Sequence, residues 1–292
     1  MRVTQSMIAR NMIVNMNRNR EAMDRLQTAM STGREVNTAS DDPVRFARSN
    51  RYRRMLALNE QFGRNINDAY GWANNYESVM TEFYDLLVES KTVAIQGSDN
   101  TQNADTRLIL ADRIDGIIDQ AISLANSSYV GKSIFAGTNT NIDEPFEYDG
   151  TTVTYLGNSG ELNRRISEDL NLTVNINGTE LEATGMFQSL IDLRDALMAN
   201  DSPATAAQIE GIDDAVQATL SLASKVGLIK NHLSMTEQRM EIAGTNIVSF
   251  LSQTEDADLA EIISKYNNEE IAYKAALQTA SKALHLNILD FI

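Results

Sequence analysis

The chain contains no cysteine, only 3 prolines and only 6% aromatic residues among its 292 residues. The absence of cysteine excludes disulfides, thiolate metal sites and a cysteine nucleophile, and it is compatible with either a reducing compartment or export. Few prolines and aromatics beside many Ala, Leu, Ser, Asn and Gln residues favour long helices over a compact core filled with aromatic rings. Helix is therefore expected to prevail.

Long hydrophobic runs are also missing. No apolar stretch approaches the roughly 18 to 20 residues that cross a bilayer. The apolar stretch near the N-terminus is interrupted after a few residues, too early for the hydrophobic region of a signal peptide. The sequence predicts neither a membrane span nor a cleaved signal peptide.

Charge is distributed unevenly along the chain. The formal net charge is −15, yet the first 64 residues hold 12 Arg against 6 acidic residues, and the remainder holds 13 Lys or Arg against 34 acidic residues. A cluster of arginines could in principle bind phosphates: Arg45, Arg48, Arg51, Arg53 and Arg54. Helical spacing distributes these side chains over more than one face, which favours a solvated or subunit-contacting helix over nucleic-acid binding.

The most informative feature is an apolar stripe at each end of the chain, with the alternating three- and four-residue spacing of a coiled-coil seam. We interpret both stripes as an assembly interface. Two helices packed only on each other would leave half of each stripe exposed to water. We therefore expect the ends to be loosely folded in the monomer and to fold when neighbouring subunits cover the stripes. The expected interface residues are Ile8, Met12, Met16, Met23, Leu26, Met30, Leu259, Ile262, Tyr266, Tyr273, Leu277, Leu284, Ile288 and Phe291.

Helix boundaries are marked by specific residues. A first helix is predicted from Gln5 to Thr32, and Gly33 follows where a left-handed residue ends a helix at least cost. Asp42 is predicted to cap the next helix with Pro43 in its first turn. That helix should reach a break at residues 97–103, and an antiparallel partner should follow to about Ser128.

Between Gly137 and Gly185 the sequence becomes rich in Gly, Thr and Asn and shows two hairpin patterns. In the first, Phe146–Tyr148 and Val153–Tyr155 flank an Asp149-Gly150 turn. In the second, an alternating run from Leu172 ends at Asn177-Gly178, with Leu181 beyond the turn. Helical periodicity then returns up to a break near Glu255.

These patterns predict a mainly α fold: a long-helix bundle with terminal coiled-coil helices and a small inserted β-rich domain. The expected divisions are an N-terminal assembly helix (1–42) pairing with a C-terminal one (253–292), a long helical hairpin (43–132), the β-rich insert (133–184) and returning helices (185–252).

Catalytic chemistry finds little support. The only histidines, His232 and His285, lie in predicted helices and have no His or Cys to share a metal. Gly131-Lys132-Ser133 imitates the end of a P-loop, but Asn126 stands where that loop needs a glycine. Acidic residues at 41, 42, 255, 256 and 258 are expected to cap helices, since helix N-termini attract carboxylates. We expect no enzyme activity, cofactor or metal.

Four segments carry a family pattern: MRVTQ at residues 1–5, STGREVNTASDDP at 31–43, SIFAGT at 133–138 and EDADLA at 255–260. Together they resemble the bacterial flagellin family. The resemblance is strong at both ends and extends in the middle only to the arrangement of elements. Flagellins usually lack the proline found at Pro43, and their first residues differ from those of this chain. Both differences favour the branch of the family that joins the flagellar hook to the filament.

The resemblance implies a structural role. Terminal helices would form a coiled inner core, the long helices a rod-like layer and the β insert an outward projection. Implied partners are further copies of the chain in a ring-like layer, a hook-associated protein on the hook side, flagellin on the filament side and an export chaperone at the C-terminal helix; neither nucleic acid nor membrane is implied. The implied location is the extracellular flagellum, reached by export without a cleaved signal.

Two alternatives stay open at this point. One is flagellin itself, the polymer of the filament. The other, from a different class, is a cytoplasmic coiled-coil adaptor that forms stable dimers through its end helices.

Overall fold

The computed structural model describes residues 5–289, apart from the side chains of residues 5, 6, 8, 9 and 283–289. The fold is mainly α with a few short strands, as predicted. The chain divides into two compact units, one formed by Met1–Leu58 with Ile242–Ile292 and the other by Asn59–Glu241. We call them unit 1 and unit 2.

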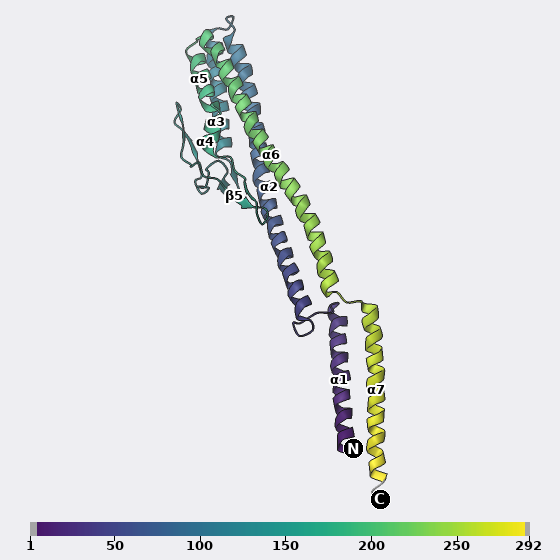
Figure 1. Ribbon diagram of the computed structural model, residues 1–292. Helices are drawn as coiled ribbons and strands as arrows, with labels where there is room; N and C mark the ends of the chain where they lie inside the picture. The colour runs from purple at the N-terminus through teal and green to yellow at the C-terminus, as the bar shows by residue number, and fades with distance from the viewer. Residues whose placement is uncertain (1–4, 290–292) are drawn as a thin grey trace. The chain divides into compact units, whose positions relative to one another are not determined.

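Unit 1 is formed by both ends of the chain. Helix α1 (Gln5–Thr32) packs along α7 (Leu259–Leu289), and the two run in opposite directions (Figure 1). The N-terminal part of α2 (Pro43–Ser98) and the C-terminal part of α6 (Ser202–Glu255) complete the unit. The predicted end of α1 at Thr32 is confirmed.

Local residues set the turn between α1 and α2. Gly33 ends α1 with a φ of 71°, a left-handed conformation that glycine adopts without steric cost. The Asp42 carboxylate accepts the amides of Val44 (2.9 Å) and Arg45 (3.0 Å), as the predicted cap requires. Pro43 is the first residue of α2 and has no amide hydrogen to leave unsatisfied.

Unit 2 is a helical bundle. The rest of α2 lies with α3 (Ala104–Ala125), α5 (Met186–Met198) and the first part of α6 around one hydrophobic core (Figure 1). Rings and branched side chains fill it, among them Tyr76, Phe83, Ile114, Ile118, Phe187 and Leu190. The predicted break between α2 and α3 is confirmed. The buried Arg107 fixes it by donating to the carbonyls of Gly97 (2.8 Å) and Asp99 (2.9 Å).

The β insert consists of three two-stranded antiparallel sheets. They pair β1 (Ser128–Tyr129) with β2 (Lys132–Ser133), β3 (Phe146–Tyr148) with β4 (Val153–Tyr155), and β5 (Asn163–Arg165) with β6 (Asn171–Thr173). The pair β3–β4 confirms the first predicted hairpin. Its turn contains Gly150 at a φ of 91°.

The second predicted hairpin is wrong. Strand β6 pairs with the preceding strand β5, so that Leu172 lies opposite Arg164. It does not pair with the residues that follow the turn at 177–178. The Asn177 side chain accepts the amide of Glu180 (3.0 Å) and caps the short helix α4 (Gly178–Glu182). Asn is as good a helix cap as a turn residue, and burial of Leu181 favours the helix here.

Tyr76 of α2 ties the insert to the bundle. Its buried hydroxyl lies against the carbonyl oxygen of Ile134 and within 3.3 Å of that of Ile176. Burial raises the pKa of this phenol well above its ordinary value, so the hydroxyl stays a donor. One side chain thereby holds two segments of the insert against the helix.

Replacing Tyr76 with Phe should therefore destabilise unit 2. We expect the free energy of unfolding to fall by about 1 to 3 kcal/mol, because two buried carbonyls lose their donor. Chemical denaturation of the full chain followed by circular dichroism measures this. Tyr84→Phe is the control, since Tyr84 is 37% exposed and should change stability little. Equal effects of the two substitutions would contradict this role of the Tyr76 hydroxyl.

Candidate assembly surface

The apolar stripes predicted at the two ends lie partly on the contact between α1 and α7. Ile262 is buried, and Met12, Met16, Met23, Leu26, Tyr266 and Tyr273 are half-buried. Met30, Leu259 and Leu277 are exposed. The side chains of Ile8, Leu284 and Ile288, and all of Phe291, lie outside the described residues. One pair of helices thus covers its stripes incompletely.

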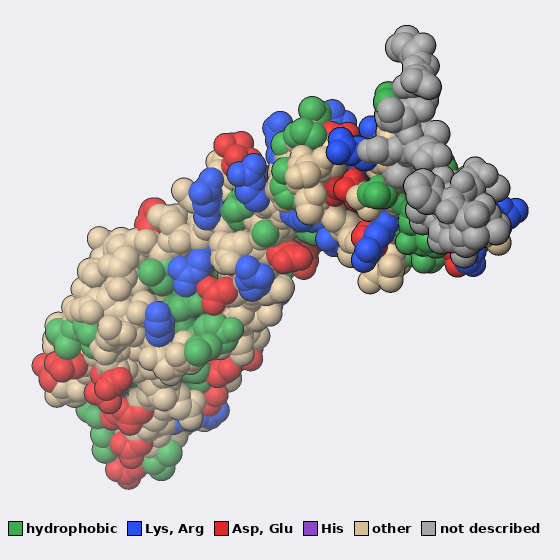
Figure 2. Space-filling model, turned by 90° about the horizontal axis from the view of Figure 1, so that it is seen from below, with side chains coloured by type: hydrophobic (Ala, Val, Ile, Leu, Met, Phe, Trp, Pro, Cys, Tyr) green, Lys and Arg blue, Asp and Glu red, His purple; other side chains and the backbone are tan. Residues whose placement is uncertain are grey.

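Both helices also carry apolar residues that point away from the predicted seam. Ile13 is 58% exposed and Ile271 is 65% exposed, with Met7, Val14 and Ile263 also open to solvent. Sequence reasoning missed them because they lie outside the three- and four-residue spacing. An available signal was that a helix apolar on more than one face is typical of a helix surrounded by partners. In Figure 2, hydrophobic side chains likewise lie open among charged ones.

A buried carboxylate connects the terminal helices to the long ones within unit 1. Glu255, whose side chain is 3% exposed, pairs with Arg34 (Nε to Oε1, 3.1 Å) and with Arg53 (Nη2 to Oε2, 2.5 Å). We call Arg34, Arg53 and Glu255 the Glu255 clamp. It joins the α1–α2 turn, α2 and the end of α6.

Backbone pairing surrounds the clamp. The Glu35 amide donates to the Glu255 carbonyl (2.7 Å), and the Ala257 amide donates to the Gly33 carbonyl (3.0 Å). Arg45 adds a bond from Nε to the Thr254 carbonyl (2.9 Å). These bonds therefore link the connection between α1 and α2 to the connection between α6 and α7. We call these two connections the chain crossings.

The expected capping roles of the acidic residues are only partly confirmed. Asp258 caps α7 by accepting the amides of Ala260 (2.9 Å) and Glu261 (3.2 Å). Asp41 accepts the amides of Thr38 and Asn37, and the Thr38 hydrogen bond holds the pKa of this carboxyl below its usual value. For Glu255 the capping interpretation is wrong, because its carboxylate is buried between two arginines.

The arginine cluster of α2 does divide between faces. Arg45 and Arg53 pair with Glu35 and Glu255 in unit 1. Arg48, Arg51 and Arg54 are exposed, and within the described part of the chain no acidic side chain pairs with them.

Features of an enzyme site are scarce. Within residues 5–289, no three His, Cys, Asp or Glu side chains are grouped so that they could hold a metal ion. None of the described helices is long and apolar enough to cross a membrane.

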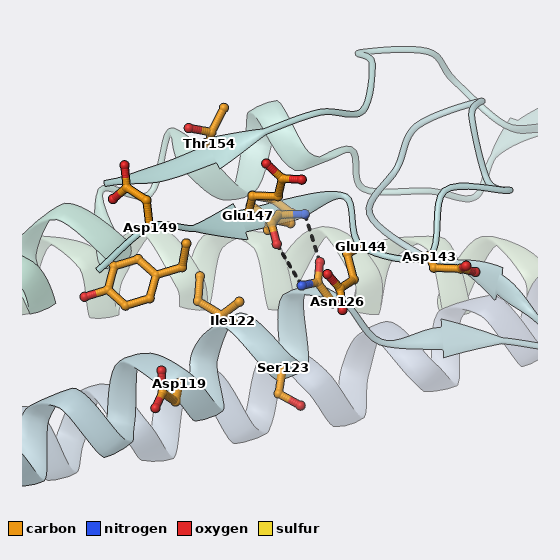
Figure 3. A pocket seen from close by; sticks show the side chains of 11 residues that line it. Asp119, Ile122, Ser123, Asn126, Asp143, Glu144, Glu147, Asp149 and Thr154 are labelled. Atoms are coloured by element: carbon orange, nitrogen blue, oxygen red, sulfur yellow. Dashed lines mark hydrogen bonds between the residues drawn. The ribbon is translucent and has the colours of Figure 1, made fainter. Parts of the chain in front are cut away.

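An open hollow of about 880 Å³ lies between the end of α3 and the β3–β4 hairpin. Figure 3 shows its lining, where the Asn126 side chain bonds to the backbone of Phe146 in both directions, each at 2.8 Å. Five of the lining residues are acidic and none is basic: Asp119, Asp143, Glu144, Glu147 and Asp149. The hollow is open and negatively charged.

Comparisons with known families match both ends of the chain. A model described as the bacterial flagellin N-terminal helical region matches residues 3–140, and one described as the bacterial flagellin C-terminal helical region matches residues 209–292. Together they cover about three quarters of the chain.

Among curated relatives, the flagellin of Bacillus subtilis (strain 168) is 24% identical over 97% of this chain and 96% of its own length. Flagellar hook-associated protein 3 of Salmonella typhimurium (strain LT2) is 24% identical over 94% of each chain.

Solved structures share the fold. A putative flagellar hook-associated protein from Vibrio parahaemolyticus has a TM-score of 0.68 at 16% identity, covering 74% of this chain and 100% of that one. FlgL of Bacillus cereus has a TM-score of 0.61 at 20% identity, covering 69% of this chain and 98% of that one.

Proposed function

Because the chain belongs to the bacterial flagellin family, we propose that it is the structural flagellar subunit that joins the hook to the filament. It acts by packing and catalyses no reaction. The observation that carries the proposal is the pair α1 and α7, which packs together and still exposes apolar side chains on both helices.

Self-assembly is the direct use of such a pair. Burying one exposed Ile or Leu fully contributes about 1.5 to 3 kcal/mol. Ile13, Ile263 and Ile271 lie outside the predicted seam and are exposed, and the end helices of further copies can cover them. Neighbouring copies supply those helices in a ring-like layer, and the predicted interface residues Met12, Met16, Ile262 and Tyr273 lie at its centre.

The junction role is supported by the relative named flagellar hook-associated protein 3, which is similar over 94% of this chain, and by a solved hook-associated protein that shares the fold. We propose a hook-associated protein as the partner on the hook side and flagellin on the filament side. Before assembly, an export chaperone covers α7, and the chain leaves the cell through the flagellar channel without a cleaved signal.

Filament flagellin is the second candidate, favoured by the similarity to the Bacillus subtilis protein over 97% of this chain. Membership of the flagellin family gives the cytoplasmic adaptor no support.

Seeded growth distinguishes junction from filament. Purified chain is added to isolated hooks and, separately, to short filament fragments, and the added mass is followed by light scattering and electron microscopy. A junction subunit should add a layer of fixed height to hooks and stop. Growth proportional to the supplied protein would identify a filament subunit, and binding to neither seed would contradict both. Purified flagellin on filament fragments is the positive control.

A further inference from the structure

The N-terminal half of α2 has an outer face that no other described residue covers. A groove of about 780 Å³ runs along it, lined by Pro43, Phe46, Ala47, Asn50, Arg54 and Ala57 among others. The spacing of these residues places them on one side of the helix. The opposite side faces inwards, where Ser49 is buried and Tyr52 stacks on Phe250 of α6 at 5.9 Å.

This outer face is cationic. Arg54 lines the groove and Arg51 lies beside it on the helix; both are exposed, and no described acidic side chain pairs with them. Arg53 also lines the groove but is paired with Glu255, and Ala47 and Ala57 leave the groove without large side chains. We call the groove residues with Arg51 the cationic face. Small residues let the backbone of another helix approach closely, and the arginines favour a helix that carries carboxylates.

A face of the opposite character lies on α3. Asp105, Asp112 and Asp119 recur every seven residues on its outer side and have no ion pair among the described residues. Leu108 is 48% exposed and Ile109 is 68% exposed between them. Nothing lies over Gly116, where an added Cβ would meet no atom within 4 Å. We call these six residues the acidic face.

The acidic face continues into the open hollow of unit 2. Asp119 belongs to both, and Asp143, Glu144 and Glu147 extend the negative charge beyond the end of α3 (Figure 3). The charge imbalance is general, because residues 59–241 contain 11 Lys or Arg against 28 acidic residues.

The two faces match in length as well as in character. Residues 43–57 and 105–119 each span about 21 Å at 1.5 Å per residue. One face offers small residues and unpaired arginines, and the other offers two large apolar side chains and unpaired aspartates. Complementary charge favours this encounter and opposes contact of either face with its own kind.

We propose that the cationic face of α2 in one copy binds the acidic face of α3 in a neighbouring copy. This contact fixes how adjacent subunits are placed in the layer. It rests on the proposed function, because it requires that copies assemble, and it adds to the end helices a second, charged contact.

Site-directed crosslinking tests the contact in the full chain, which has no cysteine of its own. Copies carrying Ala47→Cys are mixed with copies carrying Ile109→Cys and a mass tag, allowed to assemble, and oxidised. A disulfide forms only when the Cα atoms come within about 4.4 to 6.8 Å. We expect a crosslinked dimer of one tagged and one untagged copy.

Met235→Cys replaces Ile109→Cys as the matched control, because Met235 is also exposed on a helix of unit 2, at 62%. It should give no dimer with Ala47→Cys. Equal crosslinking to position 235, or dimers joined through two copies of position 47, would overturn the proposal.

Charge reversal provides the second arm. Arg51→Glu with Arg54→Glu should reduce the 47–109 crosslink at least about tenfold, as should Asp105→Lys with Asp112→Lys. Mixing the two reversed copies should restore it. Absence of restoration would overturn the proposal, while circular dichroism confirms that each variant stays helical.

Light scattering of the same samples separates this proposal from the proposed function. Assembly without the 47–109 crosslink would overturn the contact and leave the junction role intact. Failure of the cysteine-free chain to assemble at all would overturn both.

Discussion

Deletion of residues 259–292 should abolish assembly while leaving unit 2 folded. The deletion removes α7, including the buried Ile262 and the exposed Ile263 and Ile271, and leaves α1 without its helical partner. Each large apolar side chain that is fully covered in an assembly contributes about 1.5 to 3 kcal/mol. Loss of the two exposed isoleucines alone therefore removes about 3 to 6 kcal/mol of assembly free energy per subunit.

Two measurements check this expectation. Sedimentation velocity should show no species larger than the monomer, even at concentrations where the full chain assembles. Thermal unfolding of unit 2 should keep its midpoint within a few degrees, because its hydrophobic core lies entirely in residues 59–241.

A point variant distinguishes the contribution of one exposed apolar side chain to assembly from the contribution of the whole helix α7. Ile271→Ser alters a side chain that is 65% exposed, so the monomer should stay folded while assembly weakens about tenfold or more. Lys274→Ser, on the same helix, is the polar control and removes only a solvent-exposed ion pair with Glu270. Normal assembly of the deletion variant would contradict the role given to the ends.

Glu255→Ala should loosen the connection between the terminal and long helices of unit 1. Removing one partner of a buried ion pair costs about 3 to 5 kcal/mol. The cost here should be nearer 2 to 4 kcal/mol, because Arg34 and Arg53 are 46% and 35% exposed and can regain water.

Amide hydrogen exchange locates this effect. The Glu35 and Ala257 amides, which bridge the two chain crossings, should exchange about 30-fold faster or more in the Ala variant. Glu255→Gln keeps the side-chain size and one of the two acceptor oxygens and should have a smaller effect.

Glu35→Ala is the matched control for the clamp. Glu35 also pairs with an arginine, Arg45, but its side chain is 56% exposed. Exposed ion pairs contribute at most about 1 kcal/mol, so this variant should change exchange little. If the two alanine variants behaved alike, burial of Glu255 would not be what holds the crossings together.

Much of the helical framework could be predicted from the sequence because its determinants are local. Gly33 ends a helix through its own φ, and Asp42 with Pro43 starts the next one through bonds within three residues. Amphipathic spacing likewise predicted that both end helices need partners. The site prediction was less complete, because spacing alone omitted Ile13 and Ile271.

Prediction failed where two local structures compete and distant contacts decide. Asn177-Gly178 suits a hairpin turn and a helix start equally, and the packing of Leu181 in the core favours the helix. Likewise, five arginines within ten residues look alike in sequence, but only some meet acidic partners brought in from elsewhere in the chain.

The end of α1, both ends of α2, the first hairpin and the apolar character of both termini follow from the sequence alone, since they depend on residues a few positions apart. The burial of Glu255 between Arg34 and Arg53, the pairing of β6 with β5 and the open faces of α2 and α3 could be read only from the folded structure. The Glu255 clamp joins groups more than 200 residues apart, whose proximity is created by packing and leaves no periodic signal in the chain.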